Sequence, residues 1–308
     1  MAADTNASLA GDLGITAYLN LQFFDLLHET RDLKEVCTYV PFTAGAGSAT
    51  QKLRFIQPVD PMTQPGEITA PAITNWTTAN KTITVAKSNL YRSGSDLAYI
   101  TGVIQADNLV MSFLKSVVYH RSSLIAALGS GFTANTAVGS TGVALTVDTV
   151  YAGLFALRKA LVEGQIDLVT HATGITQFMA SLRGETATPL QIAPETQGAL
   201  SNDGSGNIQF SWMGVNFRSH ASVPKINPGN VDYSGFMSSP RAIAFTEAPV
   251  ANFLSRQSFN PQTVAGETAI ICQDLSTESI GARSYICHYY PGVAEMEDAR
   301  GVQVVSAV

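Results

Sequence analysis

The sequence of Ser95–Gly131 is SDLAYITGVIQADNLVMSFLKSVVYHRSSLIAALGSG, and it contains the strongest helical signal in the chain. Apolar residues recur at helical spacing on one face, and Arg121 occupies the remaining position of that face. The apolar residues are Val110, Leu114, Val117, Leu124 and Leu128. The closing glycines are typical of a helix C-terminus. At about 1.5 Å per residue the predicted helix would exceed roughly 30 Å, long enough to be the backbone of a domain.

A helix–strand–helix unit is predicted further along the chain. Asp148–Glu163 is expected to be a helix ended by Gly164, and Thr173–Arg183 a helix closed by Gly184. Between them, the apolar segment Ile166–His171 is expected to be a strand. The first helix has a single apolar stripe that comprises Val150, Leu154, Leu157 and Leu161. This succession indicates an α/β or α+β core.

The composition changes between Thr43 and Leu90 to Gly, Thr, Pro and Asn with alternating β-formers. Gln51–Ile56 and Thr82–Val85 are predicted strands, separated by a turn-rich segment with several prolines. Together they predict a long two-stranded arm with few apolar side chains to pack it. An isolated hairpin is marginally stable in water, so a long ordered one must lie on another surface. Trp76, near the base of the arm, is the predicted anchor.

Shorter elements are predicted in the rest of the chain. Thr16–Val36 has a helical pattern, after the polar leader Met1–Asp12. Phe210–Ser219 is typical of a hairpin with Gly214 at its turn. Four short strands are predicted in the last third, at Ala242–Phe245, Thr268–Gln273, Ser284–His288 and Gly301–Val305.

The chain is poor in charge for its length of 308 residues. Only 14% of its residues are charged, against about 25% in a usual soluble protein, and its formal net charge is −6. A free monomer normally covers itself with mixed charge, so we expect much of the outer surface to be hidden against partners. The acidic balance, without a basic run, disfavours specific DNA binding. No stretch approaches the roughly 20 apolar residues of a membrane span, and Met1–Thr30 lacks Lys and Arg, so neither membrane insertion nor export is expected.

Motifs that carry catalytic or metal chemistry are missing from the sequence. It contains no G-x-S-x-G, no phosphate-binding loop and no H-E-x-x-H. The glycine-rich segment Gly45–Thr50 leads into a strand and is interpreted as a hinge. The five histidines are scattered, and Glu295, Glu297 and Asp298 are interpreted as a solvated turn. We therefore expect no catalytic, cofactor-binding or metal-binding residues.

The cysteines are expected to be reduced thiols in the core. Cys37, Cys272 and Cys287 are too few and too widely spaced for a disulfide framework, and no C-x-x-C pair is present to hold zinc.

The order of these elements resembles the major capsid proteins of tailed bacteriophages, which have the Hong Kong 97-like fold. The resemblance covers roughly Thr16–Val308. Ser95–Gly131 looks like the spine helix of that family and the loop after it. Asp148–Arg183 looks like the first helix, strand and following helix of its axial domain. Phe210–Phe217, followed by Val223-Pro224, resembles its Gly-centred hairpin and downstream proline.

The resemblance implies an α+β, Hong Kong 97-like capsid fold with four parts. These are an N-terminal arm (1–42), an extension loop (43–90), a peripheral domain (91–144 and 275–308) with a spine helix at about 105–128, and an axial domain (145–274). The extension loop would lie over a neighbouring subunit. Contacts between subunits are expected at Trp76, Phe55, Ile68, Ile73, Lys52 and Lys81. The Lys–Asn crosslink of one branch of the family is not carried over to this chain, since no motif identifies the partner Asn or the assisting acid.

The implied function is structural, without enzyme activity or cofactors. The chain would self-assemble into hexamers and pentamers of an icosahedral phage head that encloses double-stranded DNA. Expected partners are other copies of the chain, a scaffolding protein in trans, portal and decoration proteins, with nonspecific proximity to packaged DNA and no membrane. The expected location is the virion capsid, assembled in the bacterial host cytoplasm. Two alternatives stay open, namely another phage structural subunit of the tail or adaptor, and a cytosolic α/β enzyme with a noncontiguous site.

Overall fold

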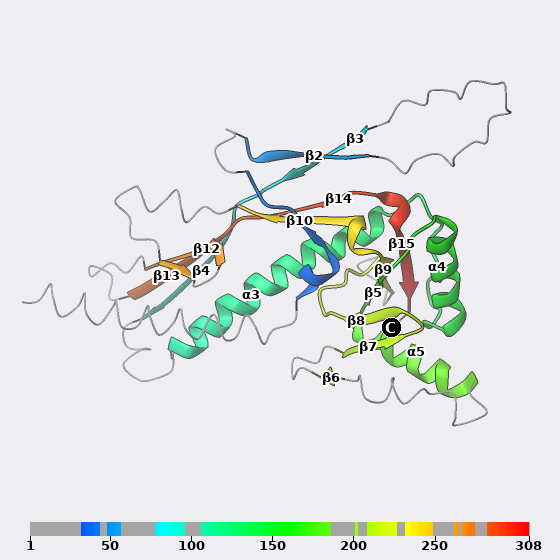
Figure 1. Cartoon of the computed structure of the whole chain (residues 1–308). Helices are drawn as coiled ribbons and strands as arrows, with labels where there is room; N and C mark the ends of the chain where they lie inside the picture. Colours follow the sequence, from blue (N-terminus) through cyan, green and yellow to red (C-terminus); the bar gives the residue numbers. More distant parts are fainter. Residues whose placement is uncertain are drawn as a thin grey trace, which may run out of the picture.

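Within the residues that it describes, the computed structural model has one long helix, two shorter α-helices and four sheets (Figure 1). It describes residues 32–43, 48–56, 78–95, 106–185, 201–202, 208–226, 232–248, 262–264, 267–274 and 282–307. The long helix is α3 (Ala106–Ala127), which confirms the helix predicted at about 105–128. It tightens into a 3₁₀ turn, η2 (Leu128–Gly131), at the predicted glycines. In the picture α3 runs along most of the described part of the molecule.

A six-stranded sheet forms the part of the molecule that α4 and α5 cover. Its order is β15 (Gly301–Ser306), β9 (Tyr233–Ser238), β5 (Ile166–Thr170), β8 (Val215–Ser219), β7 (Ile208–Trp212) and β6 (Ser201–Asn202). Every residue of β5 is buried. The reason is that Leu168 packs in a core with side chains of α4 and α5, whereas Val169 packs in a second core with side chains of α3. The predicted helix–strand–helix unit is therefore the centre of this sheet and its cover.

The two helices of this unit end at other positions than the sequence predicts. Helix α4 (Val147–Lys159) ends before Glu163, because Leu161 adopts a left-handed φ of 58° and is 82% exposed. Leu161 therefore does not continue the buried stripe. Helix α5 (Ala172–Glu185) includes Gly184, which was expected to close it.

A three-stranded sheet lies beside α3, in the order β1 (Thr38–Tyr39), β10 (Ile243–Glu247) and β14 (Pro291–Glu295). The chain passes twice between this sheet and the six-stranded one. It leaves β9 through the 3₁₀ turn η4 (Pro240–Ala242) into β10, and it returns from β14 through η5 (Asp298–Arg300) into β15.

The remaining strands form a four-stranded sheet and a hairpin. The sheet order is β11 (Gln262–Val264), β12 (Glu267–Asp274), β13 (Ala282–Tyr289) and β4 (Ser88–Ser95), and it lies toward the end of the molecule opposite α4 (Figure 1). The hairpin pairs β2 (Thr50–Ile56) with β3 (Thr78–Thr84) over seven antiparallel positions. The predicted pairing of two strands is thus confirmed, although the second strand begins at Thr78 and not at Thr82, and the segment between the strands lies outside the described residues.

Most of the predicted short strands are confirmed, and several strands were missed. The hairpin at Phe210–Ser219 and the four strands of the last third coincide with β7, β8, β10, β12, β13 and β15. The strands without a sequence signal include β4, β9 and β14. Of the helix predicted at Thr16–Val36, residues 16–31 lie outside the described residues. Its last part is not α-helical but a single 3₁₀ turn, η1 (Leu33–Val36).

Candidate functional site

The turn η1 joins the long helix to the six-stranded sheet. Asp32 caps it, since its Oδ1 accepts a hydrogen bond of 3.0 Å from the Lys34 backbone N–H. Leu33 and Val36 are buried in a cluster with side chains of α3, β5 and β9. Both apolar residues of the turn therefore hold it at the point where these elements meet.

A buried ionic cluster attaches this turn to α3. Arg121 is 1% exposed and forms ion pairs with Asp32 and, at 3.0 Å, with Glu247 of β10. The Tyr289 hydroxyl donates a hydrogen bond of 2.5 Å to Glu247, and the Ser122 hydroxyl donates one of 3.3 Å to Asp32. One cation is thus shared by two carboxylates, each of which also accepts a bond from a hydroxyl group. Such added hydrogen bonds are what a buried ion pair needs to offset its desolvation.

The environment of this cluster keeps Tyr289 protonated. Burial raises the pKa of Tyr289 well above its usual value, and Glu247 raises it further, whereas the charge of Arg121 acts in the opposite direction. The hydroxyl is therefore a donor to Glu247 at neutral pH and does not act as a base.

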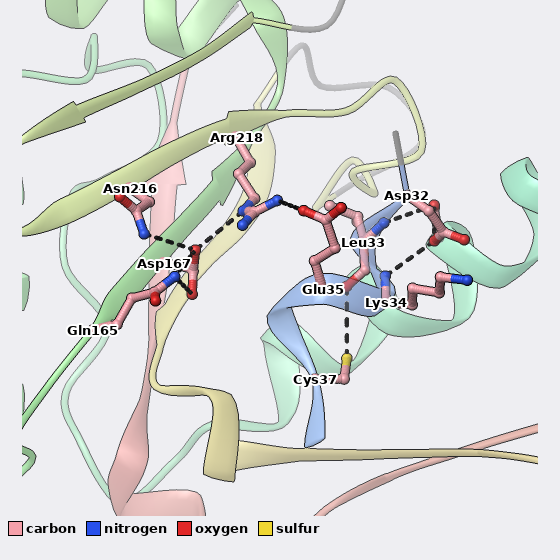
Figure 2. Close-up of polar contacts among 10 residues, drawn as sticks. Asp32, Leu33, Lys34, Glu35, Cys37, Gln165, Asp167, Asn216 and Arg218 are labelled. Carbon is pink, nitrogen blue, oxygen red and sulfur yellow. Dashed lines mark hydrogen bonds and ion pairs between the residues drawn. The ribbon is translucent and has the colours of Figure 1, made fainter. Parts of the chain in front are cut away.

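A second ionic cluster attaches the same turn to the six-stranded sheet (Figure 2). Arg218 of β8 pairs with the fully buried Asp167 of β5 at 3.1 Å and with Glu35 of η1 at 2.5 Å. Gln165 and Asn216 also donate to Asp167 at 3.3 and 3.5 Å. Burial lowers the pKa of Arg218, but the hydrogen bond to Glu35 and the charge of Asp167 together outweigh it, so that the pKa is raised. The guanidinium group consequently stays charged.

The two clusters hold η1 from two sides, and we call Asp32–Val36 with Arg121 and Arg218 the η1 junction. Its arginine–carboxylate pairs attach the turn to α3 on one side and to the six-stranded sheet on the other. The nearby Cys37 is also unsuited to reaction. Burial raises the pKa of its thiol, and the charges of Asp32 and Asp167 raise it further, so little thiolate is present.

The extended hairpin is anchored at its base on its own chain. Leu53 of β2 and Ile83 of β3 are 7% and 0% exposed, and they pack against Ala244 of β10. Lys81 forms an ion pair of 3.3 Å with Glu295 of β14. The base of the arm therefore packs on another surface, as expected, and this surface is the three-stranded sheet of the same chain.

The expected contact residues are placed by the structure only in part. Lys52 is exposed on β2, and Lys81 is partly exposed and bonded within the chain. Phe55 occupies the register position opposite Ala79. Trp76, Ile68 and Ile73 lie outside the described residues. The structure therefore leaves their contacts between subunits as a prediction.

The C-terminal carboxylates contact other segments of the chain. The solvated-turn interpretation fits Glu297 and Asp298, which lie at the turn η5 without buried residues, whereas Glu295 is the last residue of strand β14. Asp298 accepts hydrogen bonds from the backbone N–H groups of Thr133 and Ala134 and from the Thr133 hydroxyl, at 2.7 to 3.0 Å. Glu297 pairs with Arg300, and Glu295 with Lys81. The hydrogen bonds of Asp298 join the loop that follows α3 and η2 to the turn before β15.

Each histidine of the described residues has a polar side-chain partner. Their polar partners, in chain order, are Ser88 for His120, Thr173 for His171, Ser222 for His220 and Asn89 for His288. Burial lowers the pKa of His120, His171 and His288. Among the residues described here, no group of three His, Cys, Asp or Glu side chains is placed to hold a metal ion. Within the same residues, no helix has the length and apolar character needed to cross a membrane.

One exposed surface is apolar, and we call Tyr151, Phe155 and Met213 the α4 patch. The three side chains are 42%, 72% and 62% exposed. They are contiguous, since the Tyr151 hydroxyl contacts Met213 Sδ at 3.0 Å and the Tyr151 ring packs edge-on against Trp212 at 5.3 Å. Exposed charged residues, Asp148 before the patch and Arg158 and Lys159 after it, flank it along α4. An apolar centre with a charged border is the usual anatomy of a protein interface.

Comparison with solved structures identifies the fold. No protein-family model and no curated protein matches the sequence. The structure, however, is similar to the capsid of cyanophage P-SCSP1u, with 8% identity, 87% of this chain and 86% of that chain covered, and a TM-score of 0.55. It is similar to the virus-like particle from Pyrococcus furiosus, with 10% identity, coverage of 94% and 97%, and a TM-score of 0.56. It is also similar to the SrpI encapsulin complex from Synechococcus elongatus, with 12% identity, coverage of 89% and 86%, and a TM-score of 0.53.

The chain thus has the fold of proteins that build shells, and its mixed helix and sheet content belongs to that fold. Within this class it resembles the major capsid proteins of bacteriophages, as the order of its elements predicted. The similarity extends over most of both chains at low sequence identity. The η1 junction and the hairpin base are internal attachments of this fold within the described residues.

Proposed function

We propose that this chain is the structural subunit of an icosahedral phage head, forming hexamers and pentamers that enclose double-stranded DNA. The observation that carries the proposal is the similarity to solved shell proteins along 87% to 94% of the chain. In this proposal the described part is the wall of the shell. The other copies are its main partners, with a scaffolding protein in trans, portal and decoration proteins as further ones. Assembly would take place in the host cytoplasm.

The division into parts belongs to this proposal as well. The hairpin β2–β3 would start the extension loop, and α3 would be the spine of the peripheral domain. The sheets do not follow the proposed domain limits. Strand β15 pairs with β9 of the six-stranded sheet, and β10 pairs with β14. The chain therefore crosses between the two proposed domains more often than a division at residue 275 implies.

A second candidate is a shell of the encapsulin kind, which the similarity to the SrpI complex favours. Both candidates predict closed particles from this chain. They differ in the content of the particles, since only a phage head would contain nuclease-protected DNA. The acidic net charge of −6 suits a DNA container, because a strongly basic lining would hold the genome by counterion release.

Electron microscopy of the purified full-length chain tests the function. We expect closed particles, or rings of five and six subunits that close into particles at high concentration. Rings or tubes of other symmetry would indicate a tail or adaptor subunit, and a monomer at all concentrations would indicate the enzyme alternative. Nuclease treatment followed by DNA extraction from particles made during infection distinguishes a phage head from an encapsulin shell.

Deletion of Thr63–Ile73 tests the extension loop separately. We expect a folded subunit that does not form shells, since the deletion leaves β2, β3 and the hairpin base intact. A Gly/Ser segment of equal length at 63–73 is the matched control for chain length and is expected to fail as well, because it lacks the apolar side chains. Normal shells from both variants would show that this segment makes no essential contact.

A further inference from the structure

Two cysteines that are distant in the sequence occupy opposite positions in the four-stranded sheet. In the antiparallel pair β12–β13, Cys272 is the register partner of Cys287. The adjacent pairs, Ile271 with His288 and Gln273 with Ile286, continue the same register without interruption. Along the chain the cysteines are too widely spaced for a disulfide framework. The sheet, however, brings two of them to opposite positions.

The spacing of an antiparallel pair suits a disulfide. Residues directly opposite each other have Cα atoms about 4.5 or 5.5 Å apart, depending on the type of pair. Disulfides span Cα distances of about 4.4 to 6.8 Å. We propose that Cys272 and Cys287 form a modification site, at which a peroxide closes a reversible disulfide within one chain.

Cys287 also has a route by which a small oxidant reaches it. Its side chain is 2% exposed, and it lines a cavity of about 220 Å³ between α3 and the four-stranded sheet. Val117, Leu90 and Tyr289 contribute to the same cavity wall, together with polar residues of α3 and β4. A cavity of this size admits a molecule as small as hydrogen peroxide.

The oxidation is balanced as follows. The sulfur of Cys287 attacks one peroxide oxygen as it loses its proton, the O–O bond breaks, and the departing hydroxide takes up that proton to become water. The resulting sulfenic acid is attacked by the sulfur of Cys272, the S–S bond forms, and a second water leaves with the Cys272 proton. Two thiols are oxidised by two electrons, and one hydrogen peroxide is reduced to two waters.

The disulfide would tie β12 to β13 and close a loop of about 15 residues, which stabilises mainly by restricting the unfolded chain. Directly opposite strand positions place Cβ atoms about 4.5 to 5.5 Å apart, at or beyond the usual disulfide range of about 3.5 to 4.5 Å. The bond would therefore be strained and easily reduced. Because the bond is easily reduced, we expect two thiols in the reducing cytoplasm and a disulfide outside the cell. Only this expected change between the two locations rests on the proposed function.

Peptide mapping of the full-length chain tests the proposal. The reduced protein is freed of reductant, exposed to graded hydrogen peroxide, alkylated with iodoacetamide under denaturing conditions and digested without reduction. We expect a peptide pair joined through Cys272 and Cys287 that dithiothreitol separates again. Cys37 is the internal control and is expected to remain alkylated, because burial raises the pKa of its thiol. A joined pair that includes Cys37, or oxidation to sulfinic acid without any joined pair, would overturn the proposal.

Variants and mixed isotopes make the test independent of assembly. The oxidised chain is expected to melt several degrees above the reduced chain, and Cys272→Ala is expected to abolish this difference, whereas Cys37→Ala retains it. A mixture of isotopically heavy and light chains should yield no mixed pairs, and heavy–light pairs would contradict a bond within one chain. Mapping of the natural sequence decides the question even if a variant does not fold. If peptide mapping finds the Cys272–Cys287 pair in a chain that forms no shells, the disulfide proposal stands and only the proposed function is rejected.

Discussion

Arg121 connects three segments that are distant in the sequence. Its guanidinium group lies among Asp32, Glu247 and the Phe245 ring, whose centroid is 5.9 Å away. Its position on the apolar face of the predicted helix was visible in the sequence. The two carboxylates were not identifiable as its partners, because they lie about 90 and 126 residues away along the chain.

The cost of removing Arg121 measures how far the fold depends on the η1 junction. Arg121→Met leaves two buried carboxylates without a cation, and we expect a loss of about 3 to 5 kcal/mol in the free energy of unfolding. Urea denaturation of the full chain measures this loss in the free energy of unfolding. Asp32→Asn and Glu247→Gln, added to the first change, should restore part of the loss.

Arg241→Met is the matched control for this prediction. Arg241 is exposed at η4, so the same substitution should change the stability by less than about 0.5 kcal/mol. Equal effects of Arg121→Met and Arg241→Met would show that the buried cluster contributes nothing specific.

The hairpin β7–β8 shows how an element is placed by its turn. Met213 and Gly214 have left-handed φ values of 49° and 77°, the combination of a type I′ turn. Glycine adopts this conformation freely, whereas a methionine is strained there. The exposed Met213 side chain belongs to the α4 patch, which accounts for its presence at a position that favours Asn.

Met213→Asn is expected to stabilise the subunit by about 0.5 to 1 kcal/mol, since Asn tolerates the left-handed conformation. Thermal and urea unfolding check this. Gly214→Ala is the opposite control and should destabilise, because a Cβ is introduced at a positive φ. A loss of stability in Met213→Asn would mean that the contact with Tyr151 outweighs the turn strain.

Elements with a clear periodicity were predictable, and those defined by their partners were not. Helix α3 and strand β5 follow from apolar spacing, which is a local property. Strand β14 begins with Pro291 and Gly292, and β4 contains Arg92 and Gly94, so neither has a strand pattern. They are strands because β10 and β13 provide hydrogen-bond partners.

At the scale of the whole molecule, a net charge of −6 makes copies of the chain repel one another. In the proposed shell, apolar surface at the contacts between copies would offset this repulsion. The α4 patch consists of three side chains, whereas a standard interface involves about 20 to 30 residues on each side. A single contact of this kind is weak, and closure of a ring or shell would make it sufficient.

Phe155→Asp tests this interpretation. Burying a Phe side chain contributes about 1.5 to 3 kcal/mol, so each contact should weaken at least about tenfold while the subunit remains folded. Light scattering against concentration measures assembly, and circular dichroism checks the fold. Thr176→Asp, at an exposed position of α5, is the matched control and should assemble normally. Normal assembly of Phe155→Asp would exclude the α4 patch as a contact between copies.

The local patterns of this chain specify its helices, several of its strands and its poverty of charge, because periodicity and composition act within a few residues. The order of these elements was sufficient to predict a capsid-protein fold. Tertiary structure alone pairs Ser88–Ser95 with a strand nearly 200 residues later, joins Arg121 to Asp32 and Glu247, and places Cys272 opposite Cys287. These pairings depend on sheet register and on packing around α3, and hydrogen bonds between distant strands carry no mark in the sequence of either strand.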